Sequence, residues 1–382
     1  MTRFSSATLA FPALSLMLAS GPAMAQTVID SSAGMVAATV LAEGLEHPWA
    51  LAILPDGRFL VTERSGQLLV VKDGRSFAVD GVPNVVDRDQ GGLLDVALAP
   101  DFESSGRIYL TFAEPAEDAG LQRGAGTAVM AARLVLEEGA GRLEDQNVIF
   151  RMNNFNNSTR HFGSRLAVAK DGTLFVTLGD RGDMDRAQDP QDLAGGVVRI
   201  AADGSVPADN PQVEGWRPEF WSIGHRNQQG ATLRPSDGAL FTVEHGAQGG
   251  DEVNLVQAGR NYGWPVITYG RDYSGLAIGK GTEAEGMEQP LHYWDPSISP
   301  SGLDFYEGEL FPAWQGDLLS GGLSGQVLVR LDVEGDTIVG EERLFEQQLG
   351  RVRDVRVGPD GAIYLLTDDS NGKLLRLAPE GK

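Results

Sequence analysis

A short phrase that recurs along the chain constrains its fold more than any other feature. Each copy joins an apolar run, a turn with Pro, Asp or Gly, and a second, alternating run. The clearest copies pass through Pro55-Asp56-Gly57 into residues 59–62 and through Pro100-Asp101 into residues 108–111. Weaker copies cover residues 166–177, 232–243, 302–319 and 355–366. A spacing of about 45 to 65 residues is typical of one four-stranded propeller blade with its loops.

One such unit can bury its sheet faces only by stacking on its neighbours, so six copies predict a closed ring. We therefore predict an all-β fold, a six-bladed β-propeller that forms a single domain over residues 26–382. Residues 35–44 lie upstream of the first copy and are expected to add a strand to the last blade, which would close the ring. The Ala-, Gly- and Glu-rich stretch 114–157 predicts an extended hairpin. A sandwich or a barrel remains possible but explains the long period less well.

The first 25 residues have the pattern of a secretory signal peptide. Arg3 is followed by a mostly apolar run over residues 7–19, and Ala23 and Ala25 fit the small-residue cleavage rule. The run is too short to span a bilayer. A buried N-terminal helix is the alternative. We expect residues 1–25 to be a signal peptide and the mature protein to be periplasmic, without membrane insertion.

Composition narrows the classes of partner. The chain has no cysteine, so its stability must come from its core rather than from disulfides. Its formal net charge of -22 disfavours nucleic acid or an anionic membrane as a partner. A neutral small molecule such as a sugar is compatible with that charge. No phosphate-binding glycine loop of the GxxxxGK type and no GxGxxG that opens a helix is present, which disfavours nucleotide cofactors.

The segment 224–265 has the composition of a site rather than of a core. It gathers Arg226, Asn227, acids and many glycines between two short apolar runs, residues 239–243 and 252–256. Glycines allow backbone carbonyls to approach a ligand closely. The neighbouring Asp251 and Glu252 are hard oxygen donors of the kind that calcium prefers, although their spacing matches no EF-hand loop.

Two further features are candidates for chemistry. His161 lies in a polar loop that leads into a strand, where it could act as a general base or be only a hydrogen-bonded loop residue. Arg351 and Arg353 are two residues apart, so in an extended segment both side chains point to the same face. Two guanidiniums on one face make a receptor for carboxylates, whereas a solvated charged edge is the plainer interpretation.

Taken together, these residues resemble the soluble pyrroloquinoline quinone (PQQ)-dependent sugar dehydrogenases, and most closely the aldose sugar dehydrogenase branch of the glucose/sorbosone dehydrogenase family. The resemblance covers almost the whole mature chain, and the family's fold is a six-bladed propeller. The motifs that carry it stand in one order: residues 43–51, Asp89-Gln90-Gly91-Gly92-Leu93-Leu94-Asp95, His161-Phe162-Gly163-Ser164-Arg165-Leu166, Arg226-Asn227-Gln228-Gln229-Gly230, residues 244–265, and Arg351-Val352-Arg353-Asp354.

The resemblance implies roles for the residues that match the catalytic and cofactor-binding motifs. His161 matches the general base, which takes the proton of the anomeric hydroxyl while a hydride goes to the quinone. Arg226 and Asn227 match residues that contact the quinone, and Arg226 would stabilise the charge that develops on its oxygen. Arg351 and Arg353 match the pair that binds the cofactor's carboxylates.

It also implies a substrate contact and two metal sites. Gln90 matches a residue near the sugar, at the edge of the cofactor site. Gly246 and Ala247 would offer backbone carbonyls to the calcium that polarises the cofactor. Glu252 and Tyr262 match a second, structural calcium site.

The sequence departs from the family pattern at several positions. Ser324 stands where the family carries a cofactor-contacting Lys, which predicts weaker cofactor binding. Arg160 replaces the acid that precedes the base in the glucose-specific branch, so the resemblance does not imply glucose selectivity. Gln228 and Ala247 replace prolines, which should relax both loops.

These features predict a periplasmic PQQ- and calcium-dependent enzyme that oxidises aldoses to lactones and passes electrons to an external acceptor. A calcium-dependent lactonase on a six-bladed propeller is the second hypothesis. It predicts a channel calcium held by side-chain carboxylates and leaves the Arg351/Arg353 pair without a use. A non-catalytic binding propeller is the third hypothesis, and the loss of the Lys at Ser324 favours it.

Overall fold

The computed structural model of the chain describes residues 26–116 and 124–382, and the predicted signal peptide lies outside them. Nearly all of the regular structure in these residues is β-strand, which confirms the all-β prediction. The helical elements are α1 (Phe102–Ser105) and two 3₁₀ turns, Met184–Gln188 and Pro312–Trp314. No helix of the described residues is long and apolar enough to cross a membrane.

The described strands form five hydrogen-bonded sheets. In spatial order, the first contains β1 (Gln26–Ser31), β2 (Gly34–Leu45), β26 (Gly372–Pro379), β25 (Ile363–Thr367) and β24 (Val352–Val357). The second contains β3 (Pro48–Ile53), β4 (Phe59–Glu63), β5 (Gln67–Lys72), β6 (Arg75–Asp80), β10 (Ala140–Arg151), β9 (Ala125–Glu137), β8 (Arg107–Pro115) and β7 (Leu93–Leu98).

The other three sheets have five, four and four strands. The third contains β11 (Leu166–Val168), β12 (Leu174–Thr177), β13 (Gly196–Ile200), β14 (Phe220–Ile223) and β18 (Arg260–Asn261). The fourth contains β15 (Gln228–Leu233), β16 (Leu240–Glu244), β17 (Asp251–Val256) and β19 (His292–Trp294). The fifth contains β20 (Pro300–Phe305), β21 (Leu318–Gly322), β22 (Val327–Glu334) and β23 (Thr337–Leu344).

The eight-stranded sheet consists of two antiparallel groups of four strands. β3 to β6 form one group and β7 to β10 the other, and β6 and β10 join them by a short parallel pairing. The predicted long hairpin in residues 114–157 is the β9–β10 pair. This edge pairing is the reason that the sheets number five, whereas the repeats in the sequence number six.

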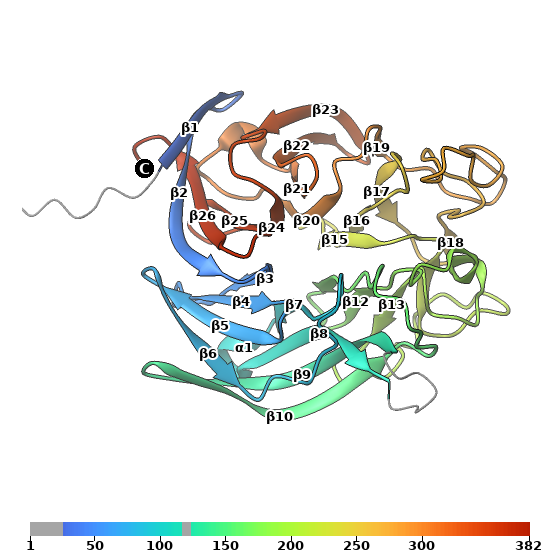
Figure 1. Cartoon of the computed structure of the whole chain (residues 1–382), viewed down its shortest axis with the longest axis horizontal. Coiled ribbons are helices and arrows are strands. Elements are labelled where there is room, and N and C mark those ends of the chain that lie inside the picture. Colours follow the sequence, from blue (N-terminus) through green and yellow to red (C-terminus); the bar gives the residue numbers. More distant parts are fainter. Residues whose placement is uncertain (1–25, 117–123) are drawn as a thin grey trace, which may run out of the picture.

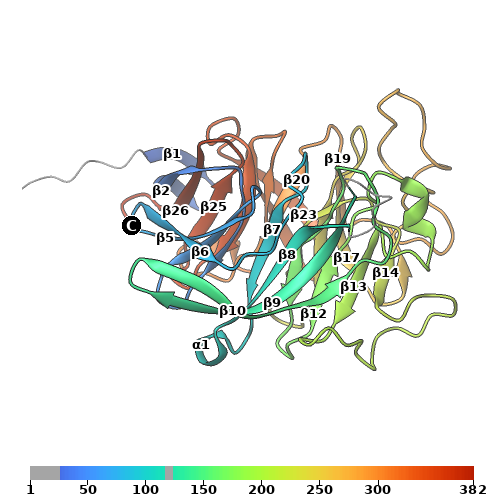
Figure 2. The ribbon, with the colours of Figure 1, turned by 60° about the horizontal axis from the view of Figure 1, so that its bottom comes forward.

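The first strands of the antiparallel groups make a ring around the centre of the molecule (Figure 1). β3 contacts β7, β7 contacts β11, β11 contacts β15, β15 contacts β20, β20 contacts β24, and β24 contacts β3 again. In the turned view, α1 lies on one face, whereas the long connection between β18 and β19 rises on the other (Figure 2). Loops from distant parts of the sequence therefore meet at either mouth of the ring.

The recurring turn has a common physical cause. In four of the copies its glycine has a left-handed φ, namely 80° at Gly57, 85° at Gly172, 77° at Gly238 and 77° at Gly361. A side chain is strained in that conformation, so the glycine marks where one strand reverses into the next.

The two ends of the chain close the ring. β2 pairs with β26 in antiparallel register, with Val36 opposite Pro379 and Thr39 opposite Arg376. Figure 1 shows β1 and β2 beside β26. The prediction that residues 35–44 add a strand to the last sheet is therefore confirmed.

The core lies between neighbouring sheets. One cluster joins Tyr109 and Val129 of the second sheet to Leu174 and Val198 of the third. Another joins Leu328 of the fifth sheet to residues of the first, such as Leu365 and Leu377. Because each sheet is buried by the next, stability comes from stacking around the ring, as expected for a chain without disulfides.

Candidate active site

His161 lies in a loop with unusual backbone geometry just before β11. His161, Gly163 and Ser164 all have left-handed φ values, 56°, 64° and 79°. Non-glycine residues adopt this conformation at a cost, and they do so most often where function requires it. The carbonyl oxygens of Ser158 and Arg160 accept hydrogen bonds from the Arg181 guanidinium, which holds the loop in place.

The His161 ring is buried and is oriented by a carboxylate. Its Nδ1 lies 2.6 Å from Oδ1 of Asp180, and Oδ2 of Asp180 accepts a hydrogen bond from Nε1 of Trp264 at 2.9 Å. Burial lowers the pKa of His161 and Arg226 adds to the effect, although Asp180 opposes it. Burial alone would raise the pKa of Asp180, but the hydrogen bond from His161 keeps it below its usual value. A neutral imidazole with Nδ1–H directed at Asp180 leaves Nε2 as a base.

Two predicted residues, in the segments that lead into β7 and β15, hold the His161 loop in place. Oε1 of Gln90 accepts a hydrogen bond from the backbone N–H of His161 at 2.7 Å. Oδ1 of Asn227 accepts one from the N–H of Gly163 at 3.1 Å. Both side chains therefore position the His161 loop, and both also line the adjoining cavity.

Arg226 lies beside His161 in a pocket of about 140 Å³ that Asp180, Trp264 and Tyr273 also line. Its Nη1 donates to the carbonyl of His245 at 3.2 Å, and its guanidinium is 5.3 Å from the Trp264 ring. Nε of Arg226 is buried without a hydrogen-bond partner among the described residues. A donor is thus available where the sequence predicted a charge-stabilising cation.

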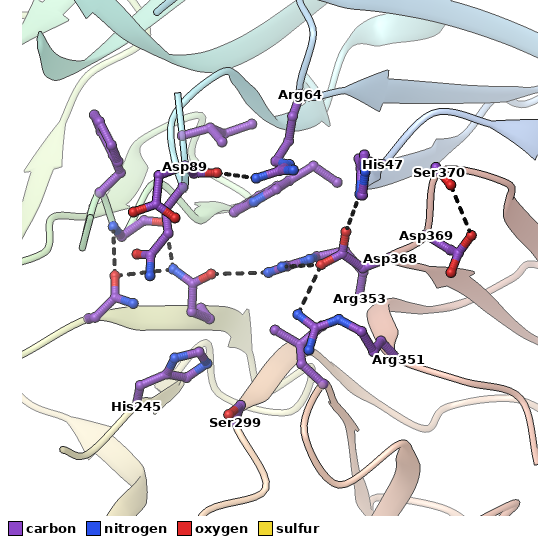
Figure 3. A pocket seen from close by; sticks show the side chains of 18 of the residues that line it. His47, Arg64, Asp89, His245, Ser299, Arg351, Arg353, Asp368, Asp369 and Ser370 are labelled. Atoms are coloured by element: carbon purple, nitrogen blue, oxygen red, sulfur yellow. Dashed lines mark hydrogen bonds and ion pairs between the residues drawn. The ribbon is translucent and has the colours of Figure 1, made fainter. Parts of the chain in front are cut away.

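Arg351 and Arg353 both turn toward one carboxylate, that of Asp368 (Figure 3). Their Nη2 atoms lie 3.2 Å and 2.8 Å from Oδ2 of Asp368, and His47 contacts Oδ1 at 3.1 Å. Burial would raise the pKa of Asp368, but the guanidiniums of Arg353 and Arg351, together with the hydrogen bond to His47, hold it well below its usual range. The predicted shared face of the two arginines is present, with an acid between them that sequence reasoning missed.

The arginine pair lines a cavity of about 650 Å³ at one mouth of the ring. Gln90, Asn227 and Arg64 line it as well. Nε of Arg64 and Nε of Arg353 are buried and have no hydrogen-bond partner among the described residues. The cavity therefore has free guanidinium donors on two sides, which suits a flat ligand with several carboxylates.

Gly246 and Ala247 lie in a tight loop that requires glycine at position 246. A Cβ on Gly246 would lie 2.2 Å from the carbonyl oxygen of Gly249. Asp251 fixes the loop, because its carboxylate accepts hydrogen bonds from the N–H of Gly246 at 2.9 Å and from the N–H groups of Ile298 and Ser299, each at 2.9 Å. Asp251 is thus a scaffold residue rather than the free calcium ligand that its sequence position suggested.

Glu252 is buried next to a second acid, Glu244, an environment that suits the binding of a cation. Burial and the nearby Glu244 raise its pKa to about 8. Asn254 donates to Glu244 at 3.1 Å and to Glu252 at 3.2 Å, while its own Oδ1 is buried without a partner among the described residues. Two acids and an unpaired amide oxygen fit a hard cation.

Tyr262 would contribute only its backbone to such a site. Its hydroxyl donates to the carbonyl of Leu255 at 2.5 Å and accepts from the N–H of Gln257 at 2.8 Å. The part of the chain that the structure describes holds no cluster of three or more His, Cys, Asp or Glu side chains suited to a metal. Calcium here would therefore need carbonyl or amide oxygens in addition to the carboxylates of Glu244 and Glu252.

Ser324 lies next to the cavity, and its hydroxyl contacts the hydroxyl of Ser299. Its Oγ lies 2.8 Å from Oγ of Ser299, a residue that lines the cavity. No cation extends from this position, in agreement with the substitution noted in the sequence.

The comparison with known proteins identifies the family. The model of the family described as glucose/sorbosone dehydrogenase matches residues 45–376. The chain belongs to the glucose/sorbosone dehydrogenase family. This confirms the resemblance, and it makes the chain an oxidoreductase rather than a lactonase or a non-catalytic propeller.

Similar proteins match most of the length of this chain. The aldose sugar dehydrogenase YliI of Escherichia coli is 43% identical over 89% of this chain and 92% of its own length. A crystal structure of a glucose dehydrogenase is 48% identical and superposes with a TM-score of 0.85 over 89% of this chain and 98% of that chain. The aldose sugar dehydrogenase of Streptomyces coelicolor, solved in its PQQ-bound form, is 27% identical with a TM-score of 0.75 over 94% and 99% of the two chains.

Proposed function

We propose that this protein is a PQQ- and calcium-dependent dehydrogenase that oxidises aldoses to lactones. The observation that carries the proposal is the adjacency of two sites. The pocket of the His161 base and the cavity of the arginine pair share a wall at Tyr273. A base, unpaired guanidinium donors and a hollow wide enough for a flat ligand thus meet at one mouth of the ring.

The residues divide the work of the reaction by their chemistry. Nε2 of His161 accepts the proton of the sugar's C1 hydroxyl, and Asp180 stabilises the imidazolium that forms. Arg351 and Arg353 would bind carboxylates of the quinone and orient it, and Arg226 would donate to its carbonyl oxygen. When bound, PQQ supplies the two-electron acceptor and calcium the Lewis acid that polarises it.

Calcium would be held at two places. The carbonyls of Gly246 and Ala247, fixed by Asp251, would bind the ion beside the quinone. Glu252, Asn254 and the carbonyl of Tyr262 would bind the second, structural ion. The support for the second site is the unpaired Oδ1 of Asn254 beside two buried acids.

The proposal includes the number of blades and the compartment. We count six blades by dividing the eight-stranded sheet at the short β6–β10 pairing, in keeping with the ring of six inner strands. Residues 1–25 would direct export, and electrons would leave through an acceptor outside the protein. N-terminal sequencing of protein from a periplasmic fraction is expected to begin at Gln26, and retention of Met1 would contradict export by cleavage.

Reconstitution tests the activity. Protein stripped with a chelator is titrated with PQQ in the presence and absence of calcium, and dye reduction is followed with a panel of aldoses. We expect turnover only with both additions. The variant His161→Ala should bind PQQ nearly as tightly as the wild type but lose most of its activity, at least about 100-fold. If the wild type binds no quinone and shows no aldose-dependent turnover, the proposal is wrong.

A further inference from the structure

The connection between β18 and β19 presents two large apolar side chains to solvent. Tyr273 and Leu276 are each 70% exposed, more than any other large hydrophobic residue in the described parts of the chain. Such exposure is unusual for a pair of neighbouring residues on a soluble surface and often marks a binding site. Both lie on the loop that rises over the mouth of the ring.

Hydrogen bonds fix the conformation of this loop. Asp272 starts a tight turn in which its carbonyl accepts from Gly275 N–H at 2.7 Å and its Oδ1 accepts from Ser274 N–H at 2.8 Å. The turn is fixed to the segment after Ala247, since Gln248 and Arg271 exchange backbone hydrogen bonds of 2.8 Å and 3.0 Å. Tyr273 is therefore displayed at a defined position.

That position is the boundary between the two halves of the active site. Tyr273 lines both the arginine cavity and the His161 pocket, and it is the one residue common to the two linings within residues 26–116 and 124–382. A substrate that passes its C1 atom between His161 and a cofactor in the arginine cavity must pass this ring.

The chemistry of the surroundings points to a sugar. The pocket beside Tyr273 offers polar groups from Arg160, His161 and Asp180 on its other sides. A pyranose has hydroxyls around its edge and apolar C–H groups on its faces, so it needs donors and acceptors around it and an aromatic ring against one face. Tyrosine supplies a large, stiff apolar surface with a polar tip.

We infer that Tyr273 is the platform on which the aldose ring lies, a binding residue that positions the C1 hydroxyl at His161. The inference rests on the proposed function. If this inference is right, removal of the Tyr273 ring weakens the binding of the sugar but not that of the quinone, because arginines bind the quinone.

The test compares Tyr273→Ala and Tyr273→Phe with the control Val339→Ala. Val339 is 52% exposed on β23 and lines none of the described cavities around the ring mouth. For each protein, loaded with calcium and PQQ, KM and kcat for a panel of aldopyranoses, the Kd of PQQ and the melting temperature are measured. Aldose binding is also followed directly by isothermal titration calorimetry, which requires no turnover.

We expect Tyr273→Ala to raise KM and the aldose Kd about fivefold to tenfold, with an unchanged PQQ Kd and melting temperature. Tyr273→Phe and Val339→Ala should behave like the wild type. An unchanged aldose affinity in Tyr273→Ala overturns the inference, and so does a weaker PQQ affinity, which would assign the ring to the cofactor. If the wild type binds aldose but does not oxidise it, the proposed function is wrong. The aldose Kd values of the wild type and Tyr273→Ala, measured by calorimetry, then still test the role of Tyr273. No aldose binding by the wild type overturns both.

Discussion

At the residue scale, His161 and Asp180 behave as a unit whose properties neither residue has alone. The carboxylate fixes the tautomer, and burial keeps the ring neutral. The sequence predicted His161 and the arginines because they stand in recognisable motifs. It did not predict Asp180 or Asp368, since each follows a different strand and reaches its partner only when the sheets are placed around the ring. The sequence around an acid in a loop does not show which cationic side chain or histidine it will contact in the folded protein.

The His161 pair makes a prediction about pH. In the proposed reaction the neutral imidazole of His161 is the active form, and burial places its pKa below the ordinary value of 6.5. As pH falls, kcat/KM should therefore remain constant through 6.5 and decline only at more acidic pH, where His161 becomes protonated. In Asp180→Asn, loss of the ionised partner should shift this decline to still lower pH and reduce kcat more than about tenfold. A decline centred above pH 6.5 in the wild type would contradict the assignment.

The arginine pair makes a second prediction, through Asp368→Asn. Without its carboxylate partner, the buried Arg353 is left uncompensated, so the free energy of unfolding of the apo-protein should fall by about 3 kcal/mol. Carboxylates of PQQ would then replace the missing acid, so the rise in melting temperature on addition of PQQ should be larger than in the wild type. An equal or smaller rise would show that the quinone does not bind at these arginines.

Ser324→Lys is the converse change at the same cavity. An added cation beside Ser299 should bind PQQ about tenfold more tightly, equivalent to about 1.4 kcal/mol. The matched control is Ser324→Gln, which adds length without charge. Equal PQQ affinity of both variants and the wild type would show that this position does not contact the cofactor.

At the element scale, the site depends on how closely loops pack at the ends of the inner strands. The strands β16 and β17 agree with the apolar runs predicted at 239–243 and 252–256, because strand signals are local. The edge pairing of β6 with β10 was not predictable, since it depends on how far a hairpin extends in space. The left-handed φ of His161 was not predictable either, because histidine adopts this conformation more often than most residues but still at only a small share of its positions.

Gly179 tests the packing of these loops. A Cβ at this position would lie 2.1 Å from the carbonyl oxygen of His161 and 3.1 Å from Oδ1 of Asn227. Gly179→Ala should therefore displace the base, with a loss of activity of more than about tenfold and of stability of about 2 kcal/mol, measured by dye reduction and urea unfolding. Gly139→Ala is the control, because no atom lies within 4 Å of a Cβ there, although its φ of 72° carries its own small strain. Wild-type activity in Gly179→Ala would show that the position of His161 tolerates movement.

At the scale of the whole molecule, the ring is what brings the site together, and the β2–β26 pairing closes it. Val36 in β2 is fully buried at this closure. Val36→Asp would bury an unpaired carboxylate and should lower the free energy of unfolding by about 3 kcal/mol, whereas Val339→Asp, on an exposed position, should have little effect. Equal stability of the two variants in urea unfolding would mean that the closure contributes little.

The most direct test of the account is a crystal structure of the protein with PQQ and calcium. We predict that the quinone lies in the cavity of about 650 Å³, with its carboxylates at Arg351 and Arg353. We also predict calcium at the carbonyls of Gly246 and Ala247, and Nε2 of His161 facing the reactive end of the quinone. A quinone bound outside this cavity, or one whose carboxylates contact neither arginine, would contradict it.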